Sequence, residues 1–149
     1  MTDEIYMSYA IEEARKAAEL GEVPIGAVIV RRGEVIARGH NLRESTSDAT
    51  AHAEVIAIRE ACRALGGWHL TDCTLYVTLE PCPMCAGATI NACIDRAVFG
   101  AYDSRDGSMG SLINLPSLPY SRRPQTCGGV LEGRCRELLT EFFKNIRKK

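Results

Sequence analysis

The sequence predicts a single α/β domain in which helices pack against a β-sheet. Three observations support this prediction: the chain has 149 residues, its hydrophobic patterns alternate between helical and strand-like periods, and it contains no internal repeat or linker. Hydrophobic residues at 46% and charged residues at 25% exclude a disordered, collagen-like or coiled-coil chain. We therefore expect one domain over residues 1–149.

The first half of the chain is expected to form a helix, a hairpin and a second helix. Apolar residues recur at three- and four-residue steps in the helices, β-rich runs flank a glycine turn in the hairpin, and glycines close both helices. These elements are a helix with apolar positions from Ile5 to Leu20 before Gly21, strands at 25–30 and 35–37 around Gly33, and a helix at 53–65 before Gly66 and Gly67.

The second half is expected to form a strand, helix and strand, then a long loop and a final helix. A strand–helix–strand unit favours parallel pairing with a right-handed crossover, and a loop this long inside a compact domain is usually functional or disordered. The elements are strands at 74–78 and 96–101, a small-residue helix at 84–93 between them, a loop rich in Gly, Ser and Pro at 103–125, and an amphipathic helix from about 132 to 146.

Charge and cysteine content narrow the class of protein. The net charge is −1, but residues 1–75 carry −4 and residues 76–149 carry +3, so a nucleic-acid binder would depend on a local basic face. The seven cysteines are an odd number and no signal-peptide pattern opens the chain, so we expect a reduced cytoplasmic protein. No run approaches the roughly 18 apolar residues of a membrane span.

Two short motifs carry the candidate chemistry. His52 and Glu54 form an H-A-E motif, and Cys82 and Cys85 form a P-C-P-M-C motif, each at a predicted helix start. Cysteines three apart share a helical face, and a helix N-terminus lowers thiol pKa. One imidazole and two thiolates supply three ligands for Zn²⁺ and leave a fourth position for a water whose pKa the metal lowers toward about 7. We interpret Glu54 as the proton carrier beside the metal.

These motifs allow three other interpretations. The C-P-x-C pair could be a redox pair, and His52 could be a capping or core histidine. A closed structural zinc site would form if Cys62, Cys73, Cys93 or Cys127 supplied a fourth ligand. The combination of H-x-E with P-C-x-x-C is far more specific, because it is the signature of zinc deaminases.

Residues 50–54, 78–88 and 98–112 together resemble the bacterial tRNA adenosine deaminase family, and the similarity runs from about residue 10 to residue 143. The resemblance implies a three-layer α/β/α cytidine deaminase-like fold with a central mixed five-stranded sheet. It implies one Zn²⁺ per subunit, held by His52, Cys82 and Cys85. It also implies a homodimer with active sites near the subunit interface.

The family resemblance further implies an activity and a substrate. The expected reaction is hydrolysis of adenosine to inosine at the wobble position of a tRNA anticodon stem-loop, by a zinc-activated water with Glu54 as proton shuttle. The candidate substrate contacts are Asn41 to the purine, Asp103 near the ribose, and Val23, Pro24, Ile25 and Ala53 at the base. Without the resemblance, Asn41 would be interpreted as a turn residue, and Asp103 equally well as a residue that begins the loop before Gly107.

Basic residues late in the chain are candidates for phosphate contacts, although cations are favoured at helix C-termini in any case. They are Arg105, Arg122, Arg123, Lys144, Arg147, Lys148 and Lys149. The sequence departs from the family at residues 121–124, where many members have Asn-His and a basic residue, and at Ala49, which replaces a common Pro. The rival functions are a deaminase of free guanine or a related base, and a zinc-stabilised binding module without catalysis.

Overall fold

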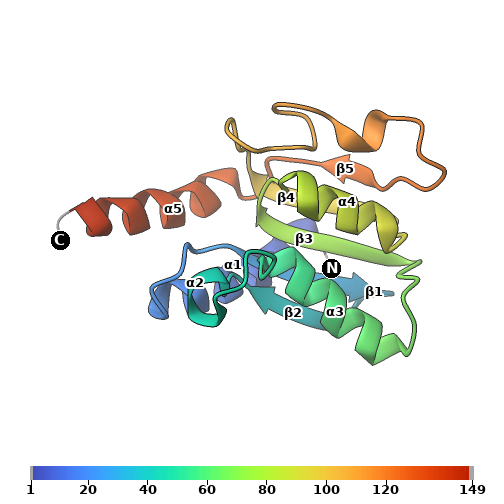
Figure 1. The fold of residues 1–149 in the computed structure, drawn as a ribbon, viewed down its shortest axis with the longest axis horizontal. Coiled ribbons are helices and arrows are strands. Elements are labelled where there is room, and N and C mark those ends of the chain that lie inside the picture. Colours follow the sequence, from blue (N-terminus) through green and yellow to red (C-terminus); the bar gives the residue numbers. More distant parts are fainter. Residues whose placement is uncertain (1, 148–149) are drawn as a thin grey trace.

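Five strands form one mixed sheet in the computed structural model, which describes residues 2–147 (Figure 1). The strands lie in the order β2-β1-β3-β4-β5. β1 pairs antiparallel with β2 and β3, whereas β4 pairs parallel with β3 and β5. The expected mixed five-stranded sheet and the parallel strand–helix–strand unit are therefore confirmed. The strands are β1 Gly26–Arg31, β2 Glu34–His40, β3 Cys73–Leu79, β4 Arg96–Ala101 and β5 Gln125–Cys127.

Helices cover both faces of the sheet, which gives three layers. α1 and α5 pack over one apolar core, and α3 and α4 over another on the opposite face. Strand alternation builds both cores: Val28 and Val30 face α1, whereas Ala27 and Ile29 face α3 and α4. The helices are α1 Asp3–Glu19, α2 Arg43–Thr46, α3 Ala53–Leu65, α4 Pro83–Asn91 and α5 Glu132–Arg147, with a 3₁₀ turn, η1, at Leu115–Ser117.

Two glycines let helices lie directly on the sheet. A Cβ at Gly26 would lie 2.1 Å from the carbonyl oxygen of Ala10 in α1, and a Cβ at Gly39 would lie 2.5 Å from the carbonyl oxygen of Ala53 in α3. Any larger residue at Gly39 would push the first turn of α3 away from β2. Because that turn carries the H-A-E motif, Gly39 fixes where the motif stands.

The structure adds two strand segments to the expected elements, besides the short helices α2 and η1, which the sequence did not predict. β5 begins at Gln125, the last residue of the expected loop, and continues for two residues that showed no strand pattern. β2 continues three residues beyond the expected end at residue 37, to His40. Both additions arise from pairing with a neighbouring strand, because β5 lies along β4 and the end of β2 lies along β1.

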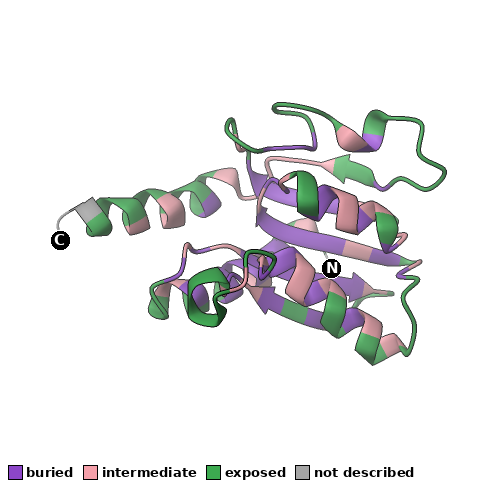
Figure 2. Cartoon of the chain, in the orientation of Figure 1, coloured by how far each residue is buried: buried purple, intermediate pink, exposed green. Residues whose placement is uncertain are grey.

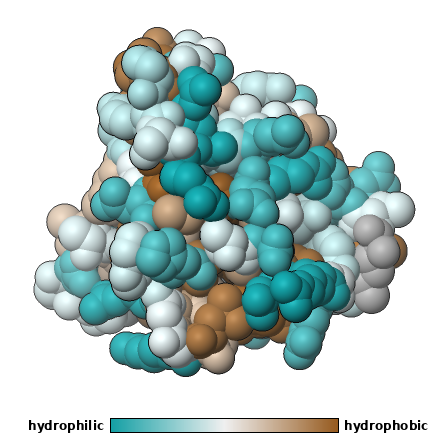
Figure 3. Space-filling view, turned by 90° about the vertical axis from the view of Figure 1, so that its right-hand side faces the viewer, coloured by the Kyte–Doolittle hydropathy of each residue, from teal (hydrophilic) through white to brown (hydrophobic). Residues whose placement is uncertain are grey.

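One face of the molecule is mostly polar, and the strands are largely buried (Figure 2 and Figure 3). Figure 2 shows buried residues concentrated in the sheet and the outer part of α5 exposed. From the right-hand side of Figure 1, hydrophilic residues cover most of the surface, and hydrophobic residues form small separate groups (Figure 3). Among residues 2–147, no helix combines the length and hydrophobicity needed to cross a bilayer.

Candidate active site

His52, Cys82 and Cys85 meet at one end of the sheet, although they belong to two different helices. His52 is the N-cap of α3 and Cys82 is the N-cap of α4, with Pro83 opening α4 as the sequence predicts. The Nδ1 atom of His52 lies 3.7 Å from Sγ of Cys82 and 3.5 Å from Sγ of Cys85. One ligand atom from each residue lies within 4.8 Å of the others. The fold therefore brings His52, Cys82 and Cys85 together as three potential metal ligands, which we call the donor group.

The chemistry of this donor set fits zinc. A hydrogen bond from the Cys85 thiol, helped by His52 and opposed by burial, lowers the pKa of Cys82 to about 4, so one thiolate is already present. The pKa of Cys85 is raised because its thiol donates that hydrogen bond and is buried near Glu54. A divalent ion that binds the sulfur displaces the thiol proton. Two sulfurs and one imidazole nitrogen match zinc preferences and leave a fourth position free. Within residues 2–147 the group includes no fourth cysteine, which argues against a closed structural site.

Glu54 lies in the first turn of α3, beside the donor group, and its side chain is almost completely buried, with 4% exposed. Burial raises the pKa of Glu54 to about 7, because a carboxylate loses hydration there, and the thiolate of Cys82 acts in the same direction. A carboxyl group with a pKa near the working pH can both accept and return a proton. The position suits the proton carrier that the sequence predicts.

The donor group opens into a pocket of about 910 Å³, large enough for a nucleoside. His52, Glu54 and Cys82 form part of its lining. The predicted substrate contacts Val23, Ile25, Asn41, Ala53 and Asp103 also line the pocket. Pro24 is buried beside them and is not part of the lining.

The side chains of Asn41 and Asp103 already hold the backbone around the pocket. Asn41 Nδ2 donates to the carbonyl of Val23 at 3.3 Å, and its Oδ1 accepts from the N–H of Arg43 at 3.2 Å. Asp103 Oδ1 accepts from the N–H groups of Arg105 at 3.0 Å and Asp106 at 3.3 Å. An amide and a carboxylate each keep further hydrogen-bonding capacity. The turn interpretation and the substrate interpretation are therefore compatible.

Residues of α5 form a pocket wall of which the sequence predicts only Lys144, as a phosphate contact. Arg136, Leu139, Thr140, Phe143 and Lys144 line the pocket, and Arg136 donates to the carbonyl oxygen of Tyr102 at 2.8 Å. The amphipathic pattern of α5 was evident in the sequence, but the pattern does not show which side of the molecule the helix reaches. Only the tertiary contact between α5 and the residues after β4 places this wall.

The predicted phosphate-binding residues fall into separate places. Arg105 and Lys144 line the pocket. Arg123 does not line it, and its guanidinium donates to the carbonyl oxygens of residues 117 and 118 at 3.3 and 3.0 Å. Arg122 is exposed away from the pocket lining. Lys148 and Lys149 lie outside the described residues, as does the side chain of Arg147.

Comparison with known proteins identifies one matching family model and several similar proteins. The model described as the cytidine and deoxycytidylate deaminase zinc-binding region matches residues 1–101. The chain is 53% identical over 148 residues to a tRNA-specific adenosine deaminase of Bacillus subtilis, covering 99% of this chain and 92% of that protein. It is 45% identical over 148 residues to a tRNA-specific adenosine deaminase of Aquifex aeolicus, covering 99% and 97%.

Among solved structures too, the chain is similar to deaminases that act on tRNA. A structure from a study of A-to-I editing by tRNA:A34 deaminases at the wobble position is 46% identical and has a TM-score of 0.86, covering 90% of this chain and 98% of that one. A guanine deaminase from Bacillus subtilis is more distant, with 33% identity, a TM-score of 0.66 and coverage of 81% and 88%.

Proposed function

The chain belongs to the zinc-binding cytidine and deoxycytidylate deaminase family, and we propose that it hydrolyses adenosine to inosine at the wobble position of a tRNA anticodon. The observation that carries this proposal is the similarity to tRNA-specific adenosine deaminases along almost the whole chain. The His-Cys-Cys group and Glu54 supply the chemistry, and the pocket above them can receive a nucleoside.

His52, Cys82 and Cys85 would hold the zinc ion in the proposed reaction. A bound zinc ion makes a water molecule nucleophilic near neutral pH. Glu54 accepts a proton from the attacking water as its oxygen bonds to C6 of adenine, and it delivers that proton to N1. Glu54 then transfers the remaining proton of the former water from the oxygen on C6 to the amino group, so that the C6–N bond breaks, ammonia leaves and the oxygen becomes the carbonyl of inosine. The burial of Glu54 supports this role, because it keeps the carboxyl group near the pKa at which both transfers occur.

The pocket lining explains how a base would be received. Val23, Ile25 and Ala53 offer apolar surface to the flat faces of a base. Asn41 retains one amide hydrogen and one lone pair after its two backbone contacts, which suits the edge of a purine. Arg105 and Lys144 add positive charge to the same lining. A polyanionic substrate would use these cations, whereas a free guanine carries no phosphate for them to bind.

A homodimer in the cytoplasm completes the proposal. Apolar side chains exposed on α4 and on the loop before β5 support an interface, namely Met84, Leu112, Ile113, Leu118 and Tyr120. All seven cysteines are free, as in a reducing compartment. Sedimentation equilibrium of the purified protein should give twice the chain mass, and a monomer at micromolar concentration would contradict the dimer.

A substrate panel tests the proposed activity. Zinc-loaded protein is incubated separately with tRNA bearing adenosine at the wobble position, the same tRNA bearing guanosine there, free adenosine, cytidine and guanine. We expect inosine only in the first tRNA, because the pocket combines a base site with cations for the flanking phosphates. Deamination of guanine with tRNA untouched would favour the nucleobase deaminase, and release of ammonia from none of them would favour the binding module.

A further inference from the structure

Glu80 is a buried carboxylate with no part in the proton transfers. It follows β3 directly, lies two residues before Cys82, and only 2% of it is exposed. Burying a carboxylate is costly unless hydrogen bonds replace its hydration. Glu80 receives these bonds from one segment, residues 103–111, which follows β4 and whose first four residues line the pocket.

Both carboxylate oxygens of Glu80 bind this segment. Oε1 accepts from the N–H of Asp103 at 3.1 Å and from the hydroxyl of Ser111. Oε2 accepts from the N–H groups of Met109 and Ser111, each at 3.0 Å. The two ends of the segment are thereby held by one side chain. Hydrogen bonds to an ionised acceptor are about twice as strong as neutral ones, so this contact is the principal polar restraint on the segment.

The backbone of the segment is shaped to lie against Glu80. A Cβ at Gly107 would lie 2.5 Å from Cδ of Glu80 and 2.4 Å from the carbonyl oxygen of Asp103, so only glycine fits there. The N–H of Ser108 donates to the carbonyl oxygen of Pro81 at 2.9 Å. These contacts bring the segment against the turn that leads into α4, which carries Cys82.

The same segment is also part of the pocket wall. Residues 102–106 line the pocket, and Asp103 caps its own turn through the N–H groups of Arg105 and Asp106. We propose that Glu80 is a positioning residue for the nucleotide substrate: its carboxylate orders residues 103–111 so that residues 103–106 form a fixed wall beside the zinc ligands. This inference rests on the proposed function, because the nucleotide that the wall receives is the one deaminated.

Ordering this wall before binding affects affinity more than chemistry. If the wall is correctly placed only a fraction of the time, the apparent dissociation constant rises by the reciprocal of that fraction. Once the substrate is bound, Glu54 and the donor group keep the positions that they have in the wild-type protein. Loss of Glu80 should therefore raise KM and leave kcat nearly unchanged. This result is expected when the lost interaction stabilised the bound substrate and the transition state equally.

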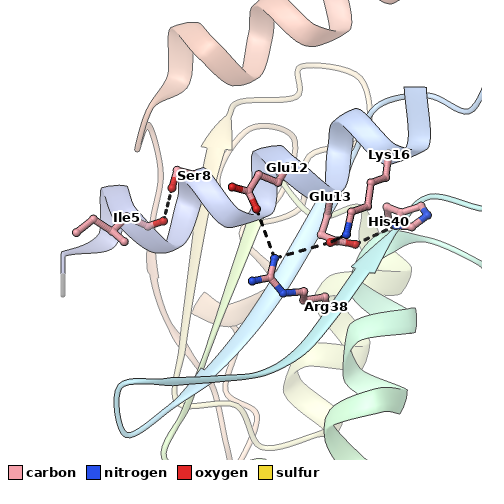
Figure 4. Close-up of polar contacts among 7 residues, drawn as sticks. All are labelled: Ile5, Ser8, Glu12, Glu13, Lys16, Arg38 and His40. Atoms are coloured by element: carbon pink, nitrogen blue, oxygen red, sulfur yellow. Dashed lines mark hydrogen bonds and ion pairs between the residues drawn. The ribbon is translucent and has the colours of Figure 1, made fainter. Parts of the chain in front are cut away.

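The test compares Glu80→Gln with Glu13→Gln. Glutamine keeps the shape of Glu80 but loses the charge and places an NH₂ group against backbone donors. Glu13 is similarly buried, with 3% exposed, but its partners come from α1 and β2 (Figure 4). Neither Glu13 nor these partners line the pocket. Glu13 accepts from Lys16 at 2.7 Å and contacts Nδ1 of His40 at 3.0 Å. It therefore controls for the general cost of neutralising a buried carboxylate.

We expect Glu80→Gln to raise KM for the tRNA by about tenfold or more, with kcat within about threefold and zinc content unchanged. Glu13→Gln should lower the melting temperature and leave KM within about twofold, because it leaves the wall ordered. Gly107→Ala, which displaces the segment while keeping Glu80, should raise KM like Glu80→Gln. An unchanged KM in Glu80→Gln, or an equal rise in Glu13→Gln, would overturn the inference.

A second measurement needs no substrate. Arg105 is exposed within the segment, and Arg122 is exposed outside it, so both are potential trypsin sites. Glu80→Gln should speed cleavage after Arg105 several-fold relative to cleavage after Arg122, and Glu13→Gln should not change this ratio. An unchanged ratio in Glu80→Gln would contradict an ordering role even if the protein deaminated no tRNA. Accelerated cleavage in an enzyme inactive on tRNA would instead support the ordering of the wall and refute the proposed substrate.

Discussion

Replacement of Glu54 by alanine is expected to slow turnover by about 10²–10⁴ while the protein keeps its zinc, because a positioned acid–base group contributes roughly that factor. Glu54 is buried beside the donor group but is not one of the three donor residues. The variant therefore removes the route for the proton and leaves the metal ligands in place. Single-turnover kinetics on tRNA, with zinc measured on the same sample, would separate the two effects.

Two further variants make this prediction specific. Glu54→Gln keeps the volume of the side chain and should be nearly as slow, because an amide cannot carry the proton. Glu60→Ala removes an exposed carboxylate from the same helix, where it pairs with Arg63 at 2.6 Å, and should behave as wild type. Wild-type turnover by Glu54→Ala at full zinc occupancy would remove Glu54 from the mechanism.

Replacement of His52 by alanine should abolish zinc retention and activity together. Removing a residue that only hydrogen-bonds to a metal ligand already weakens metal binding by about 10–100-fold, so removing a ligand itself should weaken it further. Zinc is measured after gel filtration against a weak chelator, and deamination is assayed on the same fractions.

The control for His52 is His69→Ala, which removes an exposed imidazole stacked on Trp68 at a ring distance of 3.6 Å. This variant should keep both metal and activity. If His52→Ala retained a full complement of zinc through the same treatment, His52 would not be a ligand, and the donor set would have to be drawn from other residues.

The sequence predicted those parts of the fold that local patterns determine. The helix expected at residues 53–65 was found with these bounds, because an amphipathic period and a left-handed Gly66 mark it within a single stretch of chain. β5 was not recognised, since its three residues acquire a strand conformation only by lying along β4. The residues at the end of β2 likewise depend on β1 for their conformation.

The candidate site divides in the same way. His52, Glu54, Cys82 and Cys85 could be proposed from the sequence because metal and proton chemistry restrict the residue types at fixed short spacings, and the structure places them side by side. The wall formed by α5, and the attachment of residues 103–111 to Glu80, depend on contacts between distant segments. No short pattern encodes such contacts, so they became visible only in three dimensions.

The placement of His52 and Cys82 at the caps of α3 and α4 links metal binding to folding. An ion bound there would act as a cross-link between two helix ends from separate parts of the chain. Because an ion that binds only the native state adds to its stability by mass action, resistance to unfolding should depend on the free zinc concentration. By the same thermodynamic linkage, a substitution that frays the first turn of either helix would appear as weakened metal affinity, even without touching a ligand.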